Sequence, residues 1–242
     1  MKTHTLKGFT LVEMAIVLSI IALILGTGLT LLSAQHDQRR IEDTNSLLSS
    51  ANEVLIGYAL SHTATDGRPY LPCPDKMTTA GAGTANDGVE DRTTIPGPCV
   101  VQEGNLPWVT LGLAPQTDAW SNRLRYRVTD AGANHFSNSS TGMQLTFAAD
   151  INVLDAATGN SVVTGVPALV LSHGKNGLGA INATGGGNPV ATSADEQANT
   201  DMTVNFVSHA PAPAESGYFD DQVTWLSPNI LFNRMVQAGR LP

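Results

Sequence analysis

Hydrophobic residues are concentrated in one stretch near the amino terminus. The 22 residues from Met14 to Gln35 contain no Asp, Glu, Lys or Arg. A helix rises about 1.5 Å per residue, so this stretch would extend roughly 33 Å, and a bilayer core is about 30 Å thick. Lys2 and Lys7 precede it, which favours a cytoplasmic amino end. The pattern therefore predicts a transmembrane helix over residues 9–36.

The hydrophobic pattern changes after this stretch. Ile41, Leu48 and Leu55 recur at heptad spacing, and polar residues fill the remaining positions. This predicts that the helix continues through residues 37–62 as an amphipathic segment with one buried stripe. Residues 63–242 contain short alternating runs separated by Gly, Pro and Asn, which is typical of strands and loops. We therefore expect an α+β fold: a long helix, transmembrane then amphipathic, packed on a small antiparallel β-sheet head with long loops.

Two segments of the predicted head carry specific expectations. Residues 124–128 alternate apolar and basic side chains, which predicts a strand. The basic cluster formed by Arg123, Arg125 and Arg127 is expected on a solvent-facing side of that strand, with a contact to acidic neighbouring subunits as the alternative. Residues 179–200 contain three consecutive glycines and few apolar side chains, which predicts a long mobile surface loop.

Composition narrows the function classes. The 242-residue chain is 42% hydrophobic and carries 13 Lys and Arg against 21 Asp and Glu, a formal charge of −8. It is too apolar for a disordered tail and too acidic for a general nucleic-acid binder. The sequence contains no Gly-x-Ser-x-Gly, His-Glu-x-x-His or P-loop pattern, so we expect no enzyme and no cofactor. Asp220 and Asp221 are interpreted as a turn or helix cap rather than a catalytic pair.

The chain has two cysteines, Cys73 and Cys99, each directly preceded by a proline. If the head lies outside the cytoplasm, they are expected to form a disulfide. The bridge would stabilise the fold by about 3 kcal/mol on the chain-entropy account. Two buried free thiols are the alternative, and a metal site is disfavoured because neither cysteine has a CxxC or His partner.

One residue does not suit a simple anchor. Glu13 is an ionisable residue inside the apolar segment, and a buried carboxylate needs a partner. A cleaved secretory signal peptide and a plain single-span anchor remain the alternative interpretations. The signal peptide is disfavoured because the apolar run is long and no clear small-x-small cleavage site precedes Gln35.

The residues around Glu13 resemble the amino-terminal signature of type IV pilins and pseudopilins. A short basic leader, residues 1–8, ends in Gly8 and is followed by Phe9-Thr10-Leu11-Val12-Glu13 and a long apolar helix. The resemblance covers residues 7–35. It implies that a prepilin peptidase cleaves between Gly8 and Phe9 and methylates the new amino group of Phe9. It also implies that Glu13 acts in assembly, by pairing with the amino terminus of a neighbouring subunit.

The resemblance implies a function and a location. The chain would be a structural subunit of a type IV pilus-like or pseudopilus filament, as used in type II secretion. The unusual length of its head, with the expected disulfide and loops, favours a minor or specialised subunit. It would sit in the inner membrane as a single-pass protein, with its head, residues 63–242, in the periplasm, before entering a periplasmic or cell-surface filament. The implied partners are the prepilin peptidase, other pilin or pseudopilin subunits, an inner-membrane assembly platform and membrane lipid, with no nucleic acid. A membrane-anchored periplasmic binding protein or enzyme is the alternative.

A second resemblance concerns the head. Residues 118–126 are similar to the Asp-Pro-Trp-Gly-Asn-x-x-Tyr motif of major pseudopilins, with Ala119 for Pro, Ser121 for Gly and one additional residue before the Tyr. In pseudopilins a strand ending in Ser and a Gly-rich turn lead into a calcium-binding loop. The resemblance implies calcium as a possible cofactor, and here the turn has the neutral Asn176 in place of an acidic residue. The ligands would be Ser172, Asn176, Asp195 and Asp201.

Overall fold

The fold was analysed in a computed structural model of the chain. It describes residues 8–114, 117–129, 136–145, 149–213 and 217–242, and it describes no side chains for residues 24–34. The chain divides into two compact units, Met1–Glu42 and Asp43–Pro242. The predicted leader lies almost wholly outside the described residues, which include only its last residue, Gly8.

Helix α1 extends from Leu11 to Ser61, so both units contain part of it. In the first unit, the described side chains from Leu11 to Leu23 are almost all apolar and exposed. Among the residues that the structure describes, none of the helices offers an apolar stretch long enough to cross a membrane.

This finding overturns the expected transmembrane helix over residues 9–36. It also overturns the expected location as a single-pass inner-membrane protein with a periplasmic head. Among the residues whose side chains are described, the apolar stretch of α1 is too short for a span. The described apolar side chains run from Leu11 to Leu23, 13 residues, which is roughly 20 Å of helix at about 1.5 Å per residue, whereas a span needs about 20 residues.

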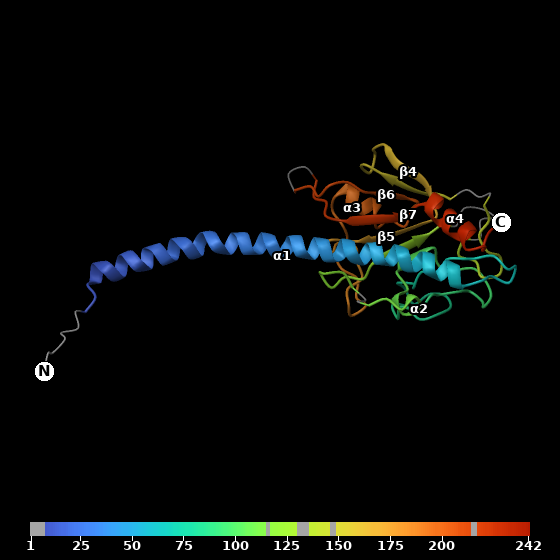
Figure 1. The fold of residues 1–242 in the computed structure, drawn as a ribbon, viewed down its shortest axis with the longest axis horizontal. Helices are drawn as coiled ribbons and strands as arrows, with labels where there is room; N and C mark the ends of the chain where they lie inside the picture. Colours follow the sequence, from blue (N-terminus) through green and yellow to red (C-terminus); the bar gives the residue numbers. More distant parts are fainter. Residues whose placement is uncertain (1–7, 115–116, 130–135, 146–148, 214–216) are drawn as a thin grey trace. The chain divides into compact units, whose positions relative to one another are not determined.

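The second unit is built on a four-stranded antiparallel sheet of order β1-β2-β5-β7 (Figure 1). Its strands are β1 (Glu103–Asn105), β2 (Arg125–Val128), β5 (Ala168–Ser172) and β7 (Gln222–Leu226). One face packs against residues 43–61 of α1. The buried cluster between them is formed by Leu48, Ala51, Leu55 and Ala59 from the helix and by Tyr126, Val128, Ala168, Val170 and Leu226 from the sheet.

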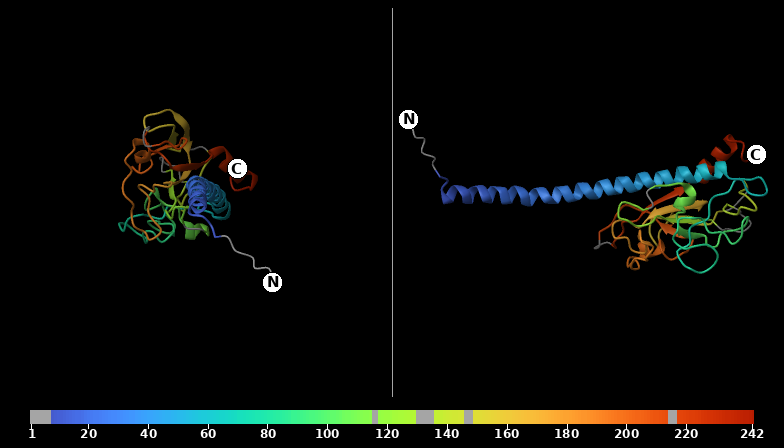
Figure 2. Two further views of the ribbon diagram at one scale, coloured as in Figure 1. Left: turned by 90° about the vertical axis from the view of Figure 1, so that its left-hand side faces the viewer. Right: turned by 90° about the horizontal axis from the view of Figure 1, so that it is seen from below.

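A second, smaller sheet covers part of the other face (Figures 1 and 2). It has the order β4-β3-β6, from β3 (Ile151–Leu154), β4 (Ser161–Val166) and β6 (Asn205–Val207). Strands β3 and β6 run parallel, so this sheet is mixed. The prediction of one small antiparallel sheet was therefore wrong. Leu169 and Leu171 alternate with residues that face α1, and this period of two lets β5 serve both layers.

Three shorter helices complete the described fold: α2 (Trp108–Leu111), α3 (Ala194–Ala198) and α4 (Pro228–Gln237). Helix α4 has Pro228 at its first turn and buries Leu231 and Met235 against the main core. Helix α3 lies within the segment that was predicted to be a mobile loop. That prediction was wrong for its carboxyl half, because Glu196 and Asn199 are buried there.

The arginines of β2 are buried, so the prediction of a solvent-facing cluster was also wrong. Tyr126 and Val128 face α1, and the arginines occupy the opposite face. The segment 183–202 covers that face. Arg123, Arg125 and Arg127 donate to the backbone carbonyls of Ala183 at 3.3 Å, Asn199 at 3.5 Å and Met202 at 3.3 Å, respectively.

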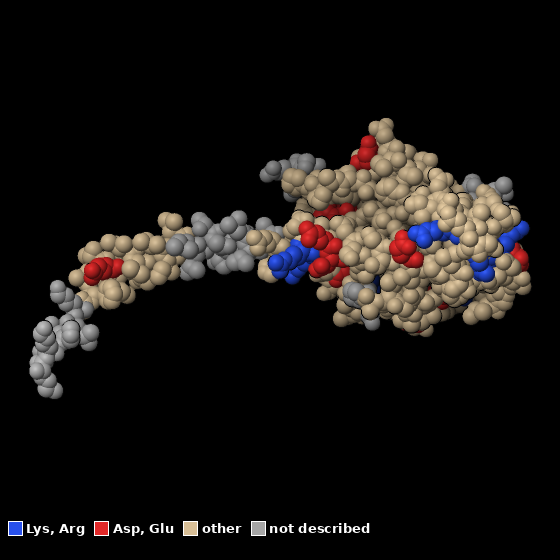
Figure 3. All heavy atoms as spheres, in the orientation of Figure 1, with Lys and Arg blue, Asp and Glu red and all other residues tan. Residues whose placement is uncertain are grey.

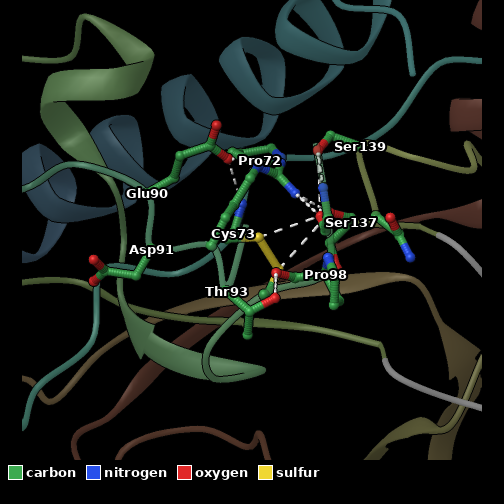
Figure 4. Close-up of a disulfide and its surroundings, with 12 residues drawn as sticks. Pro72, Cys73, Glu90, Asp91, Thr93, Pro98, Ser137 and Ser139 are labelled. Atoms are coloured by element: carbon green, nitrogen blue, oxygen red, sulfur yellow. Dashed lines mark hydrogen bonds and ion pairs between the residues drawn. A yellow bond between two sulfur atoms is a disulfide. The ribbon is translucent and has the colours of Figure 1, made fainter. Parts of the chain in front are cut away.

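The predicted disulfide is confirmed between Cys73 and Cys99 (Figure 4). Both sulfur atoms lie within 3.8 Å of the carbonyl oxygen of Ser137. Arg92 donates to the same oxygen at 2.6 Å and pairs with Glu90 at 2.8 Å. The bridge therefore sits in a buried polar network that joins three segments of the head.

Candidate functional site

The first candidate site is the start of α1. Gly8 and Phe9 precede the first helical turn, and 80% of Phe9 is exposed. The predicted cleavage bond between them is therefore outside regular secondary structure. A protease binds its substrate in an extended form, so the conformation at this bond suits the predicted processing.

Thr10 and Glu13 form a capping box at this end of the helix. The backbone N–H and the hydroxyl of Thr10 each donate to Oε2 of Glu13 at 2.8 Å, and the Glu13 N–H donates to the Thr10 hydroxyl at 3.3 Å. The backbone hydrogen bond from Thr10, helped by the one from its hydroxyl, lowers the pKa of Glu13. The hydrogen bonds from Thr10 of the same chain therefore favour the ionised form of Glu13. The Thr-x-x-Glu spacing is visible in the sequence, although the resemblance implied only an intersubunit partner for Glu13.

Apolar side chains cover every side of the first turns of α1. Leu11, Leu18 and Leu23 are 85%, 60% and 72% exposed, and the intervening Val and Ile residues are also largely exposed. Ser19 is the one polar residue between Met14 and Leu23, and it donates to the carbonyl of Ala15 at 2.8 Å. This stretch therefore presents no unsatisfied polar side chain. Apolar surface of this extent calls for a cover on all sides.

The second candidate site is a buried acidic cluster in the second unit. Carboxylate oxygens of Glu196, Asp220 and Asp221 lie within 4.8 Å of one another. Glu196 comes from α3, and the two aspartates immediately precede β7. Helix α3 is fixed at its start by Ser193, whose side chain accepts from the Glu196 N–H.

Each carboxylate of this cluster has one anchored and one unpartnered oxygen. Asn176 donates through its side chain to Oε1 of Glu196 at 2.8 Å and through its N–H to Oδ2 of Asp220 at 3.0 Å. Asn199 donates to Oδ2 of Asp221 at 2.8 Å. Oε2 of Glu196 and Oδ1 of both aspartates are buried and have no hydrogen-bond partner among the described residues. Buried oxygens of this kind cost free energy unless a proton or a cation satisfies them.

The electrostatics of the cluster reflect this arrangement. Burial raises the pKa of Glu196 to about 7, with a further contribution from Asp221 and Asp220 and an opposing one from Asn176. Burial also raises the pKa of Asp220. His173 is fully buried beside the cluster, with Nδ1 3.7 Å from Oδ1 of Asp221, and neither ring nitrogen has a hydrogen-bond partner within the described part of the chain.

The four calcium ligands expected from the sequence do not come together. Ser172 donates to Asp118 at 2.6 Å, Asp195 accepts from the N–H of Ala157 at 2.7 Å, and Asp201 accepts from the N–H of Thr203 at 2.9 Å. Of the four, Asn176 alone touches the acidic cluster. The sequence contained a signal for the cluster in the adjacent Asp220 and Asp221, which we had interpreted as a turn or cap.

The motif-like segment 118–126 has a structural role. Asp118 accepts from the N–H groups of Trp120 and Asn122, both at 2.9 Å, as well as from Ser172. Tyr126 is fully buried, and its hydroxyl donates to the carbonyl of Pro72 at 3.1 Å. Asp118 therefore fixes the turn into β2 against the end of β5.

Comparison with known proteins adds no relatives to this description. Neither family models, nor curated proteins, nor solved structures gave a match to the chain.

Proposed function

We propose that the chain is a structural subunit, minor or specialised, of a type IV pilin-like or pseudopilus filament. A prepilin peptidase would cleave it between Gly8 and Phe9, and it would assemble with other subunits through the start of α1. The observation that carries the proposal is the exposed apolar surface around the whole of residues 11–23. A single flat partner would cover one side, whereas a bundle of similar helices covers all sides. The proposed mechanism is packing, not catalysis.

Glu13 would set the register of this bundle. Cleavage removes Lys2 and Lys7 and creates a positive amine on Phe9, close in sequence to the carboxylate. Among apolar helices the carboxylate is stable only beside a positive group, so packing in the wrong register leaves a charge unpaired. The capping box uses Oε2 of Glu13 for both hydrogen bonds from Thr10, so Oε1 can accept from the amine of a neighbouring subunit.

The charge of Glu13 is expected to be required for assembly. Glu13→Gln keeps an acceptor for the capping box but removes the charge, and we expect incorporation into filaments to fall by more than about tenfold. Thr10→Ala is the matched variant: it removes the cap but keeps the charge, and a smaller effect is expected. Filament yield after shearing measures both. Equal yields from Glu13→Gln and the wild type would contradict the proposed role.

Processing provides the direct test of the proposal. Amino-terminal sequencing of the chain from cells with a prepilin peptidase should give Phe9 as the first residue. The same cells without the peptidase should give an uncleaved chain. A mature chain that begins elsewhere would refute the assignment to this class of filament subunit.

We also propose a structural calcium ion for the acidic cluster of Glu196, Asp220 and Asp221. The donors are carboxylate oxygens, which calcium prefers, and three of these oxygens are buried without partners among the described residues. Asn176 and Asn199 hold the other oxygens, so the unpartnered ones are fixed in place. The ion would link α3 to the start of β7. It would thereby stabilise the face of the four-stranded sheet that lies opposite α1.

The acidic cluster predicts a pH dependence that calcium reverses. The folded pKa of Glu196 is about 7, above its ordinary value of 4.5, so the protonated form is favoured by folding. Without metal, stability from this group is therefore full below about pH 4.5 and is lost as the pH rises towards 7, by roughly 2–3 kcal/mol. We expect a lower melting temperature at about pH 8 than at about pH 5 in a chelator.

Calcium should raise the melting temperature strongly at the higher pH and little at the lower one, because it competes with the proton. Glu196→Gln is the control, and it should flatten the dependence on both pH and calcium. A melting temperature that calcium leaves unchanged at the higher pH would rule out the proposed ion.

A further inference from the structure

Two exposed arginines on α1 have no partner among the described residues. Arg39 and Arg40 are both exposed, and neither forms a hydrogen bond or an ion pair with the part of the chain that the structure describes. Glu42 is one turn away but accepts from Gln38 at 3.1 Å. A basic residue placed before an acidic one at this spacing is also the less favourable order on a helix. These guanidinium groups are therefore available to another molecule.

The second unit offers a surface of the opposite charge. It has nine Lys and Arg against eighteen Asp and Glu, a formal charge of −9. Of the nine basic residues, five are buried: Lys76, Arg92, Arg123, Arg125 and Arg127. Figure 3 shows both basic and acidic groups on the visible surface. A second copy of this chain is thus a suitable partner for Arg39 and Arg40.

A groove in the second unit has the chemistry to bind a guanidinium group. Its volume is about 490 Å³, and it lies between the start of the α1 segment in this unit and the loop before β2. The exposed carboxylate of Asp43 is at this groove, together with the hydroxyls of Ser46, Ser50 and Thr117. Leu47 and Leu113 supply apolar contacts for the methylene groups of an arginine. Its described lining includes no basic residue.

We propose that Arg39 and Arg40 of one copy bind this groove of a second copy, with Arg39 paired to Asp43. The inference rests on the proposed filament function and specifies how neighbouring subunits are offset. Arg39 and Asp43 are one turn apart on the same helix. An offset of roughly 6 Å between parallel copies therefore brings Arg39 of one copy level with Asp43 of the next. Arginine suits the site because its planar fork matches a carboxylate.

Charge reversal in separate chains tests the proposal. With processed full-length chains, Arg39→Glu alone and Asp43→Arg alone should each reduce filament yield at least about tenfold, because each places like charges together at every contact. A mixture of the two variants should recover assembly, because the glutamate introduced in one chain then meets the arginine introduced in the other. Arg234→Glu, which makes the same charge change on α4, is the control and should assemble normally.

The outcomes separate this inference from the proposed function. If the wild type assembles and depends on Glu13, but Arg39→Glu also assembles normally, the groove contact is refuted and the filament role stands. If the mixture fails to recover while a chain carrying both substitutions does recover, the pair acts within one chain and the inference is wrong. If the processed wild type does not assemble, the proposed function and this contact both fall.

Discussion

Glu103→Ala is expected to destabilise the second unit by about 3–5 kcal/mol, the largest effect among the substitutions considered. Glu103 is 3% exposed and pairs with Arg125 at 2.8 Å and Arg127 at 3.1 Å. Burial raises the pKa of Glu103 above its ordinary value, although the charges of Arg125 and Arg127 oppose this shift. The Glu103 carboxylate is the partner that allows two guanidinium groups to lie buried between β2 and the segment 183–202 that covers it. Removing this carboxylate leaves the guanidinium groups of Arg125 and Arg127 buried without a negative partner at this position.

The effect of Glu103→Ala should extend to the acidic cluster of Glu196, Asp220 and Asp221. Arg125 also contacts the backbone carbonyl of Asn199, whose side chain holds Asp221. We therefore expect Glu103→Ala to weaken the stabilisation by calcium as well as the fold itself. Urea unfolding with and without calcium measures both quantities.

Two controls separate the ion network from general sensitivity. Glu53→Ala removes an exposed carboxylate from α1 and should change stability by less than about 0.5 kcal/mol. Replacing Glu103, Arg125 and Arg127 together with leucine or methionine should cost much less than Glu103→Ala alone, because no charge is left unpaired. A loss below about 1 kcal/mol for Glu103→Ala would show that the network is not required.

The basic cluster of Arg123, Arg125 and Arg127 shows how far the sequence could predict this fold. The alternation of Leu124, Tyr126 and Val128 with arginines predicted a strand, and the structure has β2 there. It did not predict which face is covered, because the cover comes from residues 183–202, which lie much further along the chain. The glycines of that segment suggested mobility, but its backbone carbonyls are fixed by the arginines.

The candidate sites show the same division between local and non-local information. The disulfide was predictable because only two cysteines exist. The capping box of Thr10 and Glu13 was also readable, since its two residues are three positions apart. The acidic cluster was not, because Glu196 reaches Asp220 and Asp221 only through the packing of α3 near β7. The ligand set predicted from the sequence, which included Asp195 and Asp201, therefore contained residues near Glu196 in the chain but not Glu196 itself.

The second large effect is expected from removing the Cys73–Cys99 disulfide. The bridge closes a loop with a sequence separation of 26 residues, for which the chain-entropy account gives about 3 kcal/mol at 25 °C. On this account the loss arises in the unfolded chain, which gains freedom when the loop opens. The folded network around the bridge would persist, because Arg92 still donates to Ser137 and Glu90 still accepts from the Cys73 N–H at 2.9 Å.

Cys73→Ser/Cys99→Ser should therefore lower the free energy of unfolding in urea by about 3 kcal/mol, while the tryptophan bands in the near-ultraviolet circular dichroism of the folded protein stay unchanged. The comparison that isolates the cross-link is the wild type with and without a reductant, since the wild-type chain keeps both sulfur atoms. Arg92→Leu is the contrasting variant: it leaves the bridge but removes a buried donor from Ser137 and a partner from Glu90, so it should disturb the folded spectrum. If reduction left the unfolding midpoint in place, the bridge would add no stability. If it abolished the folded spectrum, its main role would lie in the folded state, where it would hold together the segments that meet at Ser137.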